Sequence, residues 1–211
     1  MPDEKSSIDL TKDGPLIVNN LKILENSRGE VIECNNKFAL CRCGSSNNKP
    51  FCDGSHKKVG FSGDRESRLN LSREKEYEGK DISVFYNAGL CYHAEACVKN
   101  LPLVFDPKAR PWINPNASDN QAIIKTVSKC PSGALSYKIA DKHIREFNHD
   151  VKIRIDKNGP YQVRGPVELN VDKDIEPMAK DHYALCRCGA SGNKPYCDGS
   201  HSKSGFVDDK N

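Results

Sequence analysis

The most constraining feature of this sequence is an internal repeat. The stretch FALCRCGSSNNKPFCDGSHKKVGF, residues 38–61, recurs without a gap as YALCRCGASGNKPYCDGSHSKSGF, residues 183–206, at an offset of 145 positions. The same offset places Gly14 on Gly159, so the repeating unit is about 48 residues long. A copied unit of this length indicates a repeated structural module. The sequence therefore predicts two similar small modules separated by a stretch of different sequence.

Three domains follow from this repeat: module 1 at 1–61, an insert at 62–150 and module 2 at 151–211. Short runs of apolar residues bounded by Gly and Pro are typical of strands and predict a β-rich α+β fold. These runs are 16–18, 21–24, 151–155 and 161–163 in the modules, and 81–86, 104–105 and 134–139 in the insert. A helix in the insert is expected to start at the capping box of Ser118 and Gln121 and to end before Pro131.

The composition limits what can hold such modules together. The chain has 211 residues, a net charge of +3 with both signs interspersed, and no apolar run long enough to span a membrane. We therefore expect no nucleic-acid or membrane partner and, without a signal-peptide pattern, a cytoplasmic location. Ten cysteines in a reducing compartment predict metal or redox sites rather than disulfides. Because modules of about 50 residues bury little apolar surface, a bound metal centre should supply part of their folding energy.

Each module carries Cys-x-Cys, eight intervening residues and then Cys-Asp-Gly-Ser-His. Three thiolates and one imidazole are also a ligand set that structural zinc accepts, but zinc motifs usually separate paired cysteines by about two to four residues. Cys-x-Cys instead holds two thiolates close enough to bind one iron of a cluster. The spacing favours an iron-sulfur cluster, with structural zinc as the alternative. The candidate ligands are Cys41, Cys43, Cys52 and His56 in module 1, and Cys186, Cys188, Cys197 and His201 in module 2.

These motifs resemble the CDGSH iron-sulfur motif of the mitoNEET family, including its fixed Ser46, Pro50, Ser191 and Pro195. The resemblance implies a [2Fe-2S] cluster in each module, with the Cys-x-Cys pair on the inner iron and the Cys-His pair on the outer one. Paired CDGSH units in that family share strands, which implies an intramolecular pseudo-dimer and a monomeric chain. A neutral histidine ligand implies a higher reduction potential than in all-cysteine centres, a pH-dependent potential and acid lability.

Charged residues beside the ligands allow weaker predictions. Asp53 and Asp198 are expected to accept backbone N–H bonds within the ligand loops rather than to act as bases. Tuning of the potential is one role for the basic neighbours of the ligands, but we expect them to be solvated surface charges. These neighbours are Arg42, Lys49, Arg187 and Lys194.

The insert has a different cysteine pattern, with Cys91 and Cys97 in CYHAEAC and Cys130 directly before a proline. A remote Cys-Pro completes the ligand set of bacterial ferredoxins, and residues 80–140 resemble a divergent mono-cluster ferredoxin domain. The resemblance implies that the three cysteines are the first, third and remote ligands, with Ala94 at the position of the second. Three outcomes stay open: a [3Fe-4S] cluster, a [4Fe-4S] cluster with His93 as its fourth ligand, or a decayed site.

The remaining candidates have no ligand spacing. Cys34 is expected to be a small buried apolar residue, Phe105 and Trp112 are expected in the core of the insert, and the other histidines are expected to be solvated. These histidines are His143, His149 and His182.

No nucleophile–base set, phosphate loop or flavin fingerprint is found, so we expect the chain not to be an enzyme. The leading interpretation is one-electron transfer through two [2Fe-2S] clusters and one [3Fe-4S] or [4Fe-4S] cluster, with an internal relay and redox proteins as partners. The second is delivery of iron-sulfur clusters to apo acceptors, or redox and pH sensing. The third is a structural zinc protein.

Overall fold

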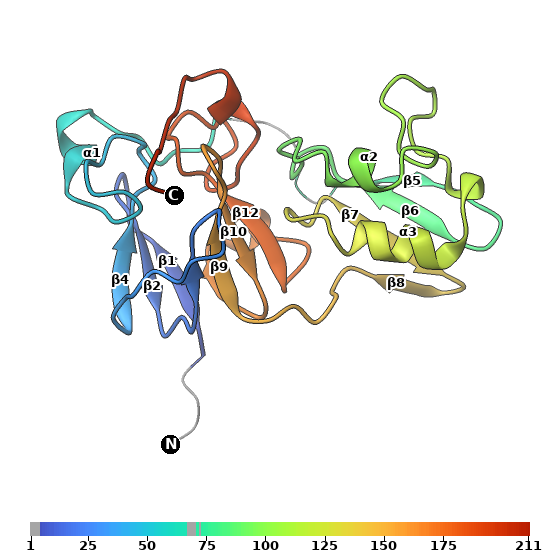
Figure 1. The fold of residues 1–211 in the computed structure, drawn as a ribbon, viewed down its shortest axis with the longest axis horizontal. Helices are drawn as coiled ribbons and strands as arrows, with labels where there is room; N and C mark the ends of the chain where they lie inside the picture. Colours follow the sequence, from blue (N-terminus) through green and yellow to red (C-terminus); the bar gives the residue numbers. More distant parts are fainter. Residues whose placement is uncertain (1–4, 67–70, 72) are drawn as a thin grey trace.

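The computed structural model describes residues 5–66, 71 and 73–211, and this part of the chain contains three four-stranded sheets. The boundary between module 1 and the insert, placed by sequence at Ser62, is followed by positions 67–70 and 72, which lie outside the described residues. Two of the sheets belong to the modules and the third to the insert (Figure 1).

The modules have the same antiparallel core. Module 1 pairs β1 (Ser7–Leu10) with β2 (Leu16–Asn19) and β2 with β4 (Lys37–Leu40). Module 2 pairs β9 (Lys152–Ile155) with β10 (Tyr161–Arg164) and β10 with β12 (His182–Leu185). The alternation of side chains that is typical of strands explains β2, in which Leu16 and Val18 are buried while Ile17 and Asn19 are half-buried.

Each module contributes one strand to the sheet of the other. Strand β3 (Leu24–Glu25) of module 1 pairs in parallel with β9, and β11 (Glu168–Asn170) of module 2 pairs in parallel with β1. The sheet orders are therefore β11-β1-β2-β4 and β12-β10-β9-β3. Neither module sheet is complete without the other copy of the repeat.

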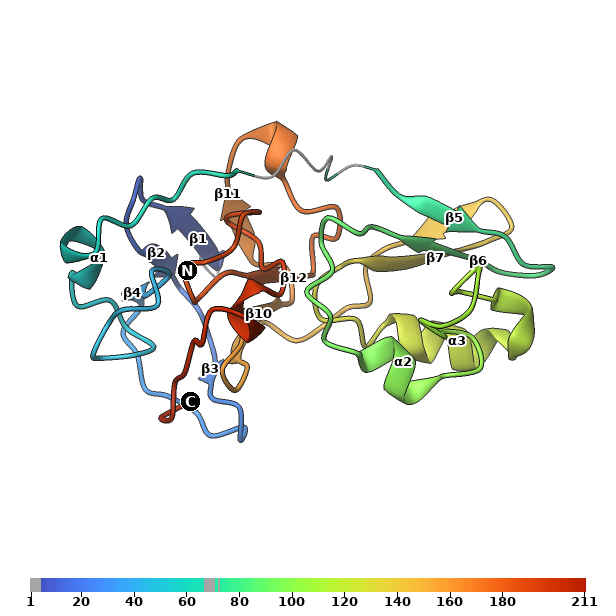
Figure 2. The ribbon, with the colours of Figure 1, turned by 90° about the horizontal axis from the view of Figure 1, so that it is seen from above.

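The insert folds as a meander with short helices. Its sheet has the order β5-β6-β7-β8, all antiparallel, and α2 and α3 pack beside it (Figure 2). The element bounds are β5 (Lys75–Tyr77), β6 (Ser83–Tyr86), α2 (Ala96–Asn100), α3 (Asn120–Val127), β7 (Leu135–Ile139) and β8 (Lys142–Ile144). The expected strands at 81–86 and 134–139 are present, whereas residues 104–105 form only an isolated bridge from Phe105 to Ile113.

The start of α3 differs from the expected capping box. Asp119, not Ser118, caps the helix by accepting the backbone N–H of Ala122 at 2.9 Å. Both residues are good N-caps, and the correct one lies one position further along. The helix ends at Val127, three residues before Cys130.

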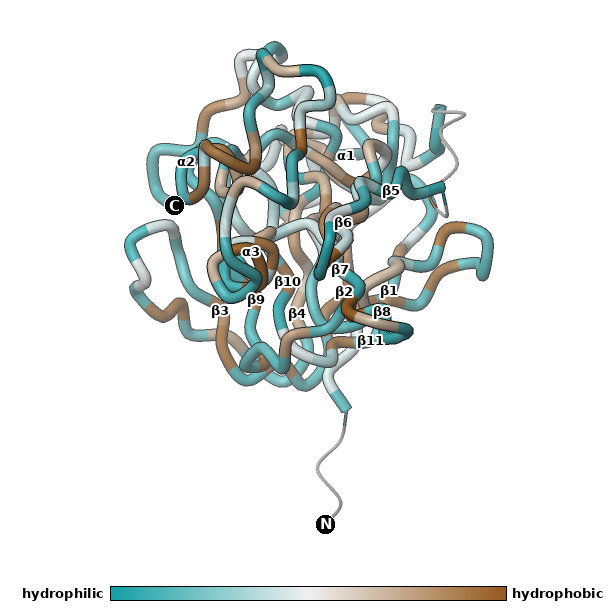
Figure 3. Tube along the Cα trace, turned by 90° about the vertical axis from the view of Figure 1, so that its right-hand side faces the viewer, coloured by the Kyte–Doolittle hydropathy of each residue, from teal (hydrophilic) through white to brown (hydrophobic). Residues whose placement is uncertain are grey.

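One hydrophobic cluster includes residues of all three sheets, among them Ile8, Tyr161 and Val84, and also Phe105 of the insert, each fully buried. Phe105 thus lies in the core as expected, and Trp112 packs half-buried against it with ring centroids 6.2 Å apart. Seen from the insert end, α3 carries a hydrophobic stretch (Figure 3). None of the described helices is long and apolar enough to cross a membrane.

The insert lies beside module 2, and module 1 is on the far side (Figures 1 and 2). Further short helical segments are α1 (Ser55–Lys58) and the 3-10 turns Pro115–Ala117, Lys173–Ile175 and Ser200–Ser202. The helix α1 and the turn at Ser200 carry the motif histidines.

Candidate metal centres

The candidate ligands of each module gather as two pairs. In module 1 the Sγ atoms of Cys41 and Cys43 are 3.6 Å apart, and Cys52 Sγ is 3.4 Å from His56 Nδ1. In module 2 the corresponding distances are 3.8 Å and 3.3 Å. In each module the Cys-x-Cys segment follows the last core strand, which is β4 or β12. Between the third cysteine and the histidine the chain turns at a glycine in the left-handed backbone conformation, Gly54 or Gly199.

These separations match ligands that share one tetrahedral metal ion. With metal–sulfur bonds of about 2.3 Å and metal–nitrogen bonds of about 2.0 Å, two sulfurs lie about 3.8 Å apart and a sulfur and a nitrogen about 3.5 Å. Each Cys-x-Cys pair and each Cys-His pair therefore fits one metal ion without rearrangement.

The four candidate ligands of a module do not form one compact group. Among the residues that the structure describes, one group of three or more His, Cys, Asp or Glu ligand atoms lies within 4.8 Å of one another, and it contains no motif cysteine. The two pairs of each module are thus separate from each other. A centre with two metal ions suits this arrangement better than one zinc ion does.

A hydrogen bond between the two thiols of each Cys-x-Cys pair shifts their pKa values in opposite directions. The hydrogen bond from Cys43 lowers the pKa of Cys41 to about 6, and that from Cys186 lowers the pKa of Cys188 to about 6. The same bond raises the pKa of the partner thiol, Cys43 or Cys186, so each pair loses its first proton more easily than its second.

The acidic residues of the motif support the ligand loops. Asp53 accepts backbone N–H bonds from Asn47 at 2.9 Å and from Ser55 at 3.0 Å, and Asp198 accepts the two equivalent bonds at 2.9 Å each. The prediction for these two carboxylates is confirmed. They fix the loop between the second cysteine and the histidine.

The expectation of solvated basic residues is wrong for Arg42 and Arg187, which are 4% and 1% exposed. Arg42 donates to the carbonyls of Gly14 and Thr11, both at 2.6 Å. Arg187 makes the equivalent bonds and also an ion pair with buried Asp208. These guanidiniums bind the carbonyls of the first hairpin turn and so anchor each Cys-x-Cys segment to its own module. Lys194 is also buried, whereas Lys49 is half-buried.

The two ligand loops touch each other. Cys43 and Cys188 form an isolated antiparallel bridge, and a Cβ on Gly44 would lie 2.4 Å from the carbonyl oxygen of Cys188. Gly189 has the reciprocal contact with Cys43 at 2.6 Å. Tyr161, fully buried in module 2, donates its hydroxyl to the carbonyl of Cys41 at 2.7 Å. Residues of both modules therefore shape each other's site.

The insert brings its three cysteines to one cavity of about 30 Å³. Cys91, Cys97 and Cys130 line it, and so does Ala94, the residue at the position of the missing ligand. Burial raises the pKa of Cys91 and raises that of Cys97 to about 11. Three thiols around one space are a suitable donor set for a cluster, although the cavity is small for one.

His93 lies elsewhere. Its side chain is exposed, its φ is +61°, and it lines an outer groove beside Cys91 and Cys97 rather than the inner cavity. Cys34 is half-buried and packs against the core of module 1, where burial raises the pKa of its thiol.

Tyr92 links the central cavity to module 2. It lines the cavity, belongs to a small buried cluster with Ala184 and Cys197, and its ring lies 6.2 Å from that of His201. Its hydroxyl donates to Asp156 at 2.9 Å and accepts a bond from Gln162 at 3.1 Å. One side chain thus separates the central site from the outer ligand pair of module 2.

Other segments also cover the module 2 loop. Buried Asn193 donates to the carbonyl of Gly89 and accepts a bond from Arg65 at 2.8 Å, while Glu66 donates its N–H to Gly192 at 2.9 Å. The equivalent position in module 1, Asn48, is exposed. The insert, including its first residues Arg65 and Glu66, therefore shields the module 2 site.

The contact of Tyr92 with Asp156 and Gln162 was not predicted from the sequence. A signal was present in the comparison of the two copies, because Asp156 and Gln162 correspond to Thr11 and Ile17 in module 1. Gln162 stands where module 1 has apolar Ile17, and Asp156 places a charge where module 1 has neutral Thr11. Such differences between the copies indicate a contact that only one copy makes.

The three histidines expected to be solvated are not. His182 is 1% exposed, and His143 and His149 are half-buried. His143 pairs with Ser136 Oγ at 2.8 Å and lies against the ring of Phe85. A histidine side chain is polar, but its ring can be buried where a ring nitrogen has a hydrogen-bond partner. The burial of a histidine is therefore hard to predict from the sequence.

Comparison with known proteins agrees with this organisation. Residues 13–57 and 158–202 match the family described as iron-binding zinc finger, CDGSH type, and residues 77–140 match the divergent 4Fe-4S mono-cluster family. Two curated relatives, both named uncharacterized protein YjdI, from Escherichia coli K12 and Escherichia coli O157:H7, are each 39% identical over 62 residues, which is 29% of this chain and 82% of the relative. No solved structure matches the chain.

The chain belongs to the CDGSH-type iron-binding family and carries a divergent 4Fe-4S mono-cluster domain between its two CDGSH domains. It is an iron-sulfur binding protein.

Proposed function

We propose that this protein transfers single electrons through three centres: a [2Fe-2S] cluster at each CDGSH motif, and a [3Fe-4S] or [4Fe-4S] cluster held by Cys91, Cys97 and Cys130. The observation that carries the proposal is the arrangement of the motif ligands as two separate pairs, which suits two irons better than one zinc ion. The reciprocal exchange of β3 and β11 supports an intramolecular pseudo-dimer of the two modules.

When bound, the clusters supply the one-electron chemistry, and the residues of this chain set its conditions. His56 and His201 contribute neutral ligands, which raises the reduction potential above that of all-cysteine sites. Asp53, Asp198 and the two buried arginines hold the ligand loops in place, so little reorganisation accompanies a change of charge. The described residues offer no set of groups suited to substrate chemistry, and a carrier role fits them better than an enzyme.

The contact of Tyr92 supports an internal relay. This residue lies between the central cavity and the buried pair of Cys197 and His201, so a single side chain spans the two sites. Module 1 has no equivalent contact with the insert in the described residues: a Cβ on Gly54 would meet nothing within 4 Å. We therefore place module 2 next to the central site in the relay and module 1 at its outer end.

Rapid-mixing reduction of the anaerobic protein, with the clusters resolved by their spectra, tests the relay. We expect the central site and module 2 to be reduced with linked rates, and Tyr92→Leu to slow the second of these steps. Tyr137→Leu, which changes an aromatic residue of the insert packed against Phe147, serves as the control and should leave both rates unchanged. Independent rates in the unmodified protein would contradict the relay.

A second candidate function is delivery of an iron-sulfur cluster from module 1 to apo acceptors. The observation that favours it is exposure, because Cys52 is half-buried and its loop is not covered by the insert, whereas Cys197 is 2% exposed. Incubation with an apo-ferredoxin tests this function. Transfer blocked by His56→Cys but retained in His201→Cys supports delivery from module 1, and no transfer from the unmodified protein excludes it.

A further inference from the structure

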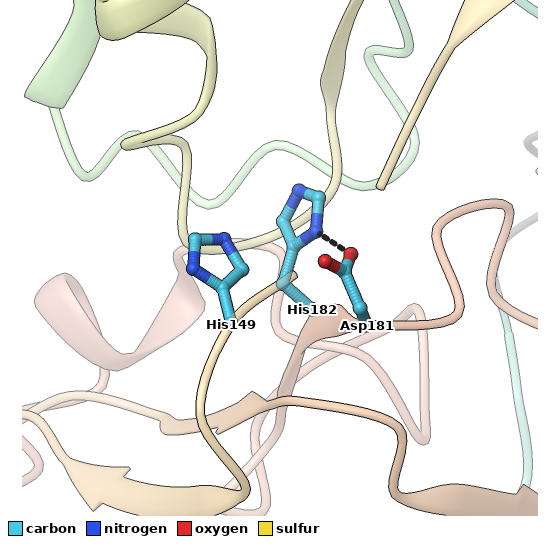
Figure 4. Close-up of side chains that lie close together, drawn as sticks. All are labelled: His149, Asp181 and His182. Carbon is cyan, nitrogen blue, oxygen red and sulfur yellow. Dashed lines mark hydrogen bonds and ion pairs between the residues drawn. The ribbon is translucent and has the colours of Figure 1, made fainter. Parts of the chain in front are cut away.

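A group of three potential metal ligands lies outside all three cluster sites. His149 is in the connection from β8 to β9, and Asp181 and His182 are at the start of β12 (Figure 4). One ligand atom from each of the three lies within 4.8 Å of the others. The two imidazole rings have centroids 5.3 Å apart and are inclined by 80°. The group therefore joins the exit of the insert to β12, the edge strand of the module 2 sheet.

His182 has a free nitrogen in a buried position. Its Nδ1 is 2.6 Å from Asp181 Oδ1, but its Nε2 has no hydrogen-bond partner, although the residue is only 1% exposed. A buried polar atom without a partner destabilises the folded state. Figure 4 shows Nε2 on the side of the ring away from Asp181, and a Cβ on Gly133 would approach it to 3.9 Å. An additional ligand would satisfy this atom.

The charges of the group favour a cation. Burial by itself would raise the pKa of Asp181, but hydrogen bonds from His182 and from the backbone N–H of Phe147 lower it to about 2. Burial lowers the pKa of His149, so this imidazole is neutral at pH 7 and has a lone pair to donate. The donors are therefore the ring nitrogens of His149 and His182, and the Asp181 carboxylate adds a negative charge beside them.

We propose that His149, Asp181 and His182 form a binding site for one divalent transition-metal ion of the zinc type. Imidazole nitrogens suit zinc and its neighbours, whereas magnesium and calcium prefer oxygen ligands throughout. A carboxylate that receives the Nδ1–H of a histidine commonly orients that ring for metal binding through Nε2, and Asp181 is placed for this role. The ion would tie the 146–150 connection to β12.

The site is specific to module 2. The positions of Asp181 and His182 correspond in module 1 to Asn36 and Lys37, and Lys37 is exposed. The repeat therefore conserves the cysteine sites in both copies but not this group. It contains no cysteine, so it is chemically distinct from the cluster sites.

Zinc titration of the anaerobic protein with its clusters in place, followed by calorimetry and by metal analysis of the protein after gel filtration, tests the proposal. We expect one Zn²⁺ per chain with no loss of iron. His149→Ala, a change at a half-buried side chain, should lower the affinity by more than about 100-fold, and Asp181→Asn by about 10- to 100-fold. His143→Ala, at a half-buried histidine outside the group, is the matched control and should bind as tightly as the unmodified protein.

Binding of ¹¹³Cd²⁺ followed by NMR distinguishes this site from the cysteines. A signal in the range of nitrogen and oxygen ligands that is lost in His149→Ala supports the proposal. The proposal is overturned if the unmodified protein binds no Zn²⁺, if His149→Ala binds it equally well, or if the cadmium signal is that of sulfur ligands.

Discussion

The two CDGSH sites have the same candidate ligands at the same spacing but different surroundings. In module 1, Cys52 is half-buried and nothing would meet a Cβ on Gly54 within 4 Å. In module 2, Cys197 is 2% exposed and a Cβ on Gly199 would lie 3.1 Å from the carbonyl oxygen of Tyr92. The repeat determines the chemistry of the two sites, and the insert makes one of them an internal site.

The largest effect is expected from Tyr92→Ala, which removes a side chain 6% exposed between the insert and module 2. The loss of a buried aromatic ring should lower the free energy of unfolding by about 3–5 kcal/mol. The substitution should also expose the module 2 site, so that a chelator removes its iron at least about tenfold faster. A tenfold change corresponds to a decrease of about 1.4 kcal/mol in the free energy of local opening. Iron release from the unmodified protein should show a fast phase for module 1 and a slow phase for module 2. A single phase before mutation would contradict the comparison.

A smaller effect is expected at the matched asparagines Asn193 and Asn48. Asn193→Ala leaves the carbonyl of Gly89 without its donor in a buried contact and should cost about 1–3 kcal/mol. Asn48→Ala changes an exposed side chain and should stay within about 0.5 kcal/mol. Chemical denaturation of the two variants measures both values, and equal losses would show that the insert does not shield module 2.

The matched glycines should differ by less. Gly54 and Gly199 have φ of +85° and +88°, so alanine is strained at either position by about 1–2 kcal/mol. Gly199→Ala must in addition displace the carbonyl of Tyr92 and should cost about 1 kcal/mol more than Gly54→Ala. Thermal unfolding of the two variants gives the difference, and a greater loss in Gly54→Ala would argue against the Tyr92 contact.

The smallest difference between the modules is expected for the ligands themselves. Replacing either histidine by cysteine adds a negative charge to the centre and should lower its midpoint potential by roughly 100 mV or more. His56→Cys and His201→Cys should each shift one centre and leave the other nearly unchanged, as measured by redox titration with electron paramagnetic resonance. A variant with no shifted centre would remove that histidine from the ligand set.

The repeat predicted much of the fold and most of the candidate ligands. Motif spacing predicted four candidate ligands in each module, and the structure places them as two close pairs because residues close in sequence are close in space. The contacts of Asp53 and Asp198 with their own loops could be predicted for the same reason. The position of the insert did not follow from the sequence, because the contact of Tyr92 with Asp156 spans 64 residues. The burial of Arg42 also could not be seen, since its partners Thr11 and Gly14 lie about 30 residues earlier in the chain.

The central claim is that the motif residues bind iron-sulfur clusters, and the most direct test is the content of iron, acid-labile sulfide and zinc in anaerobically purified protein. We predict about seven to eight irons per chain with a matching amount of sulfide, from two [2Fe-2S] centres and a three- or four-iron centre. About four irons would leave the CDGSH sites intact and the insert without a cluster. Two or three zinc ions per chain and no sulfide would contradict the account.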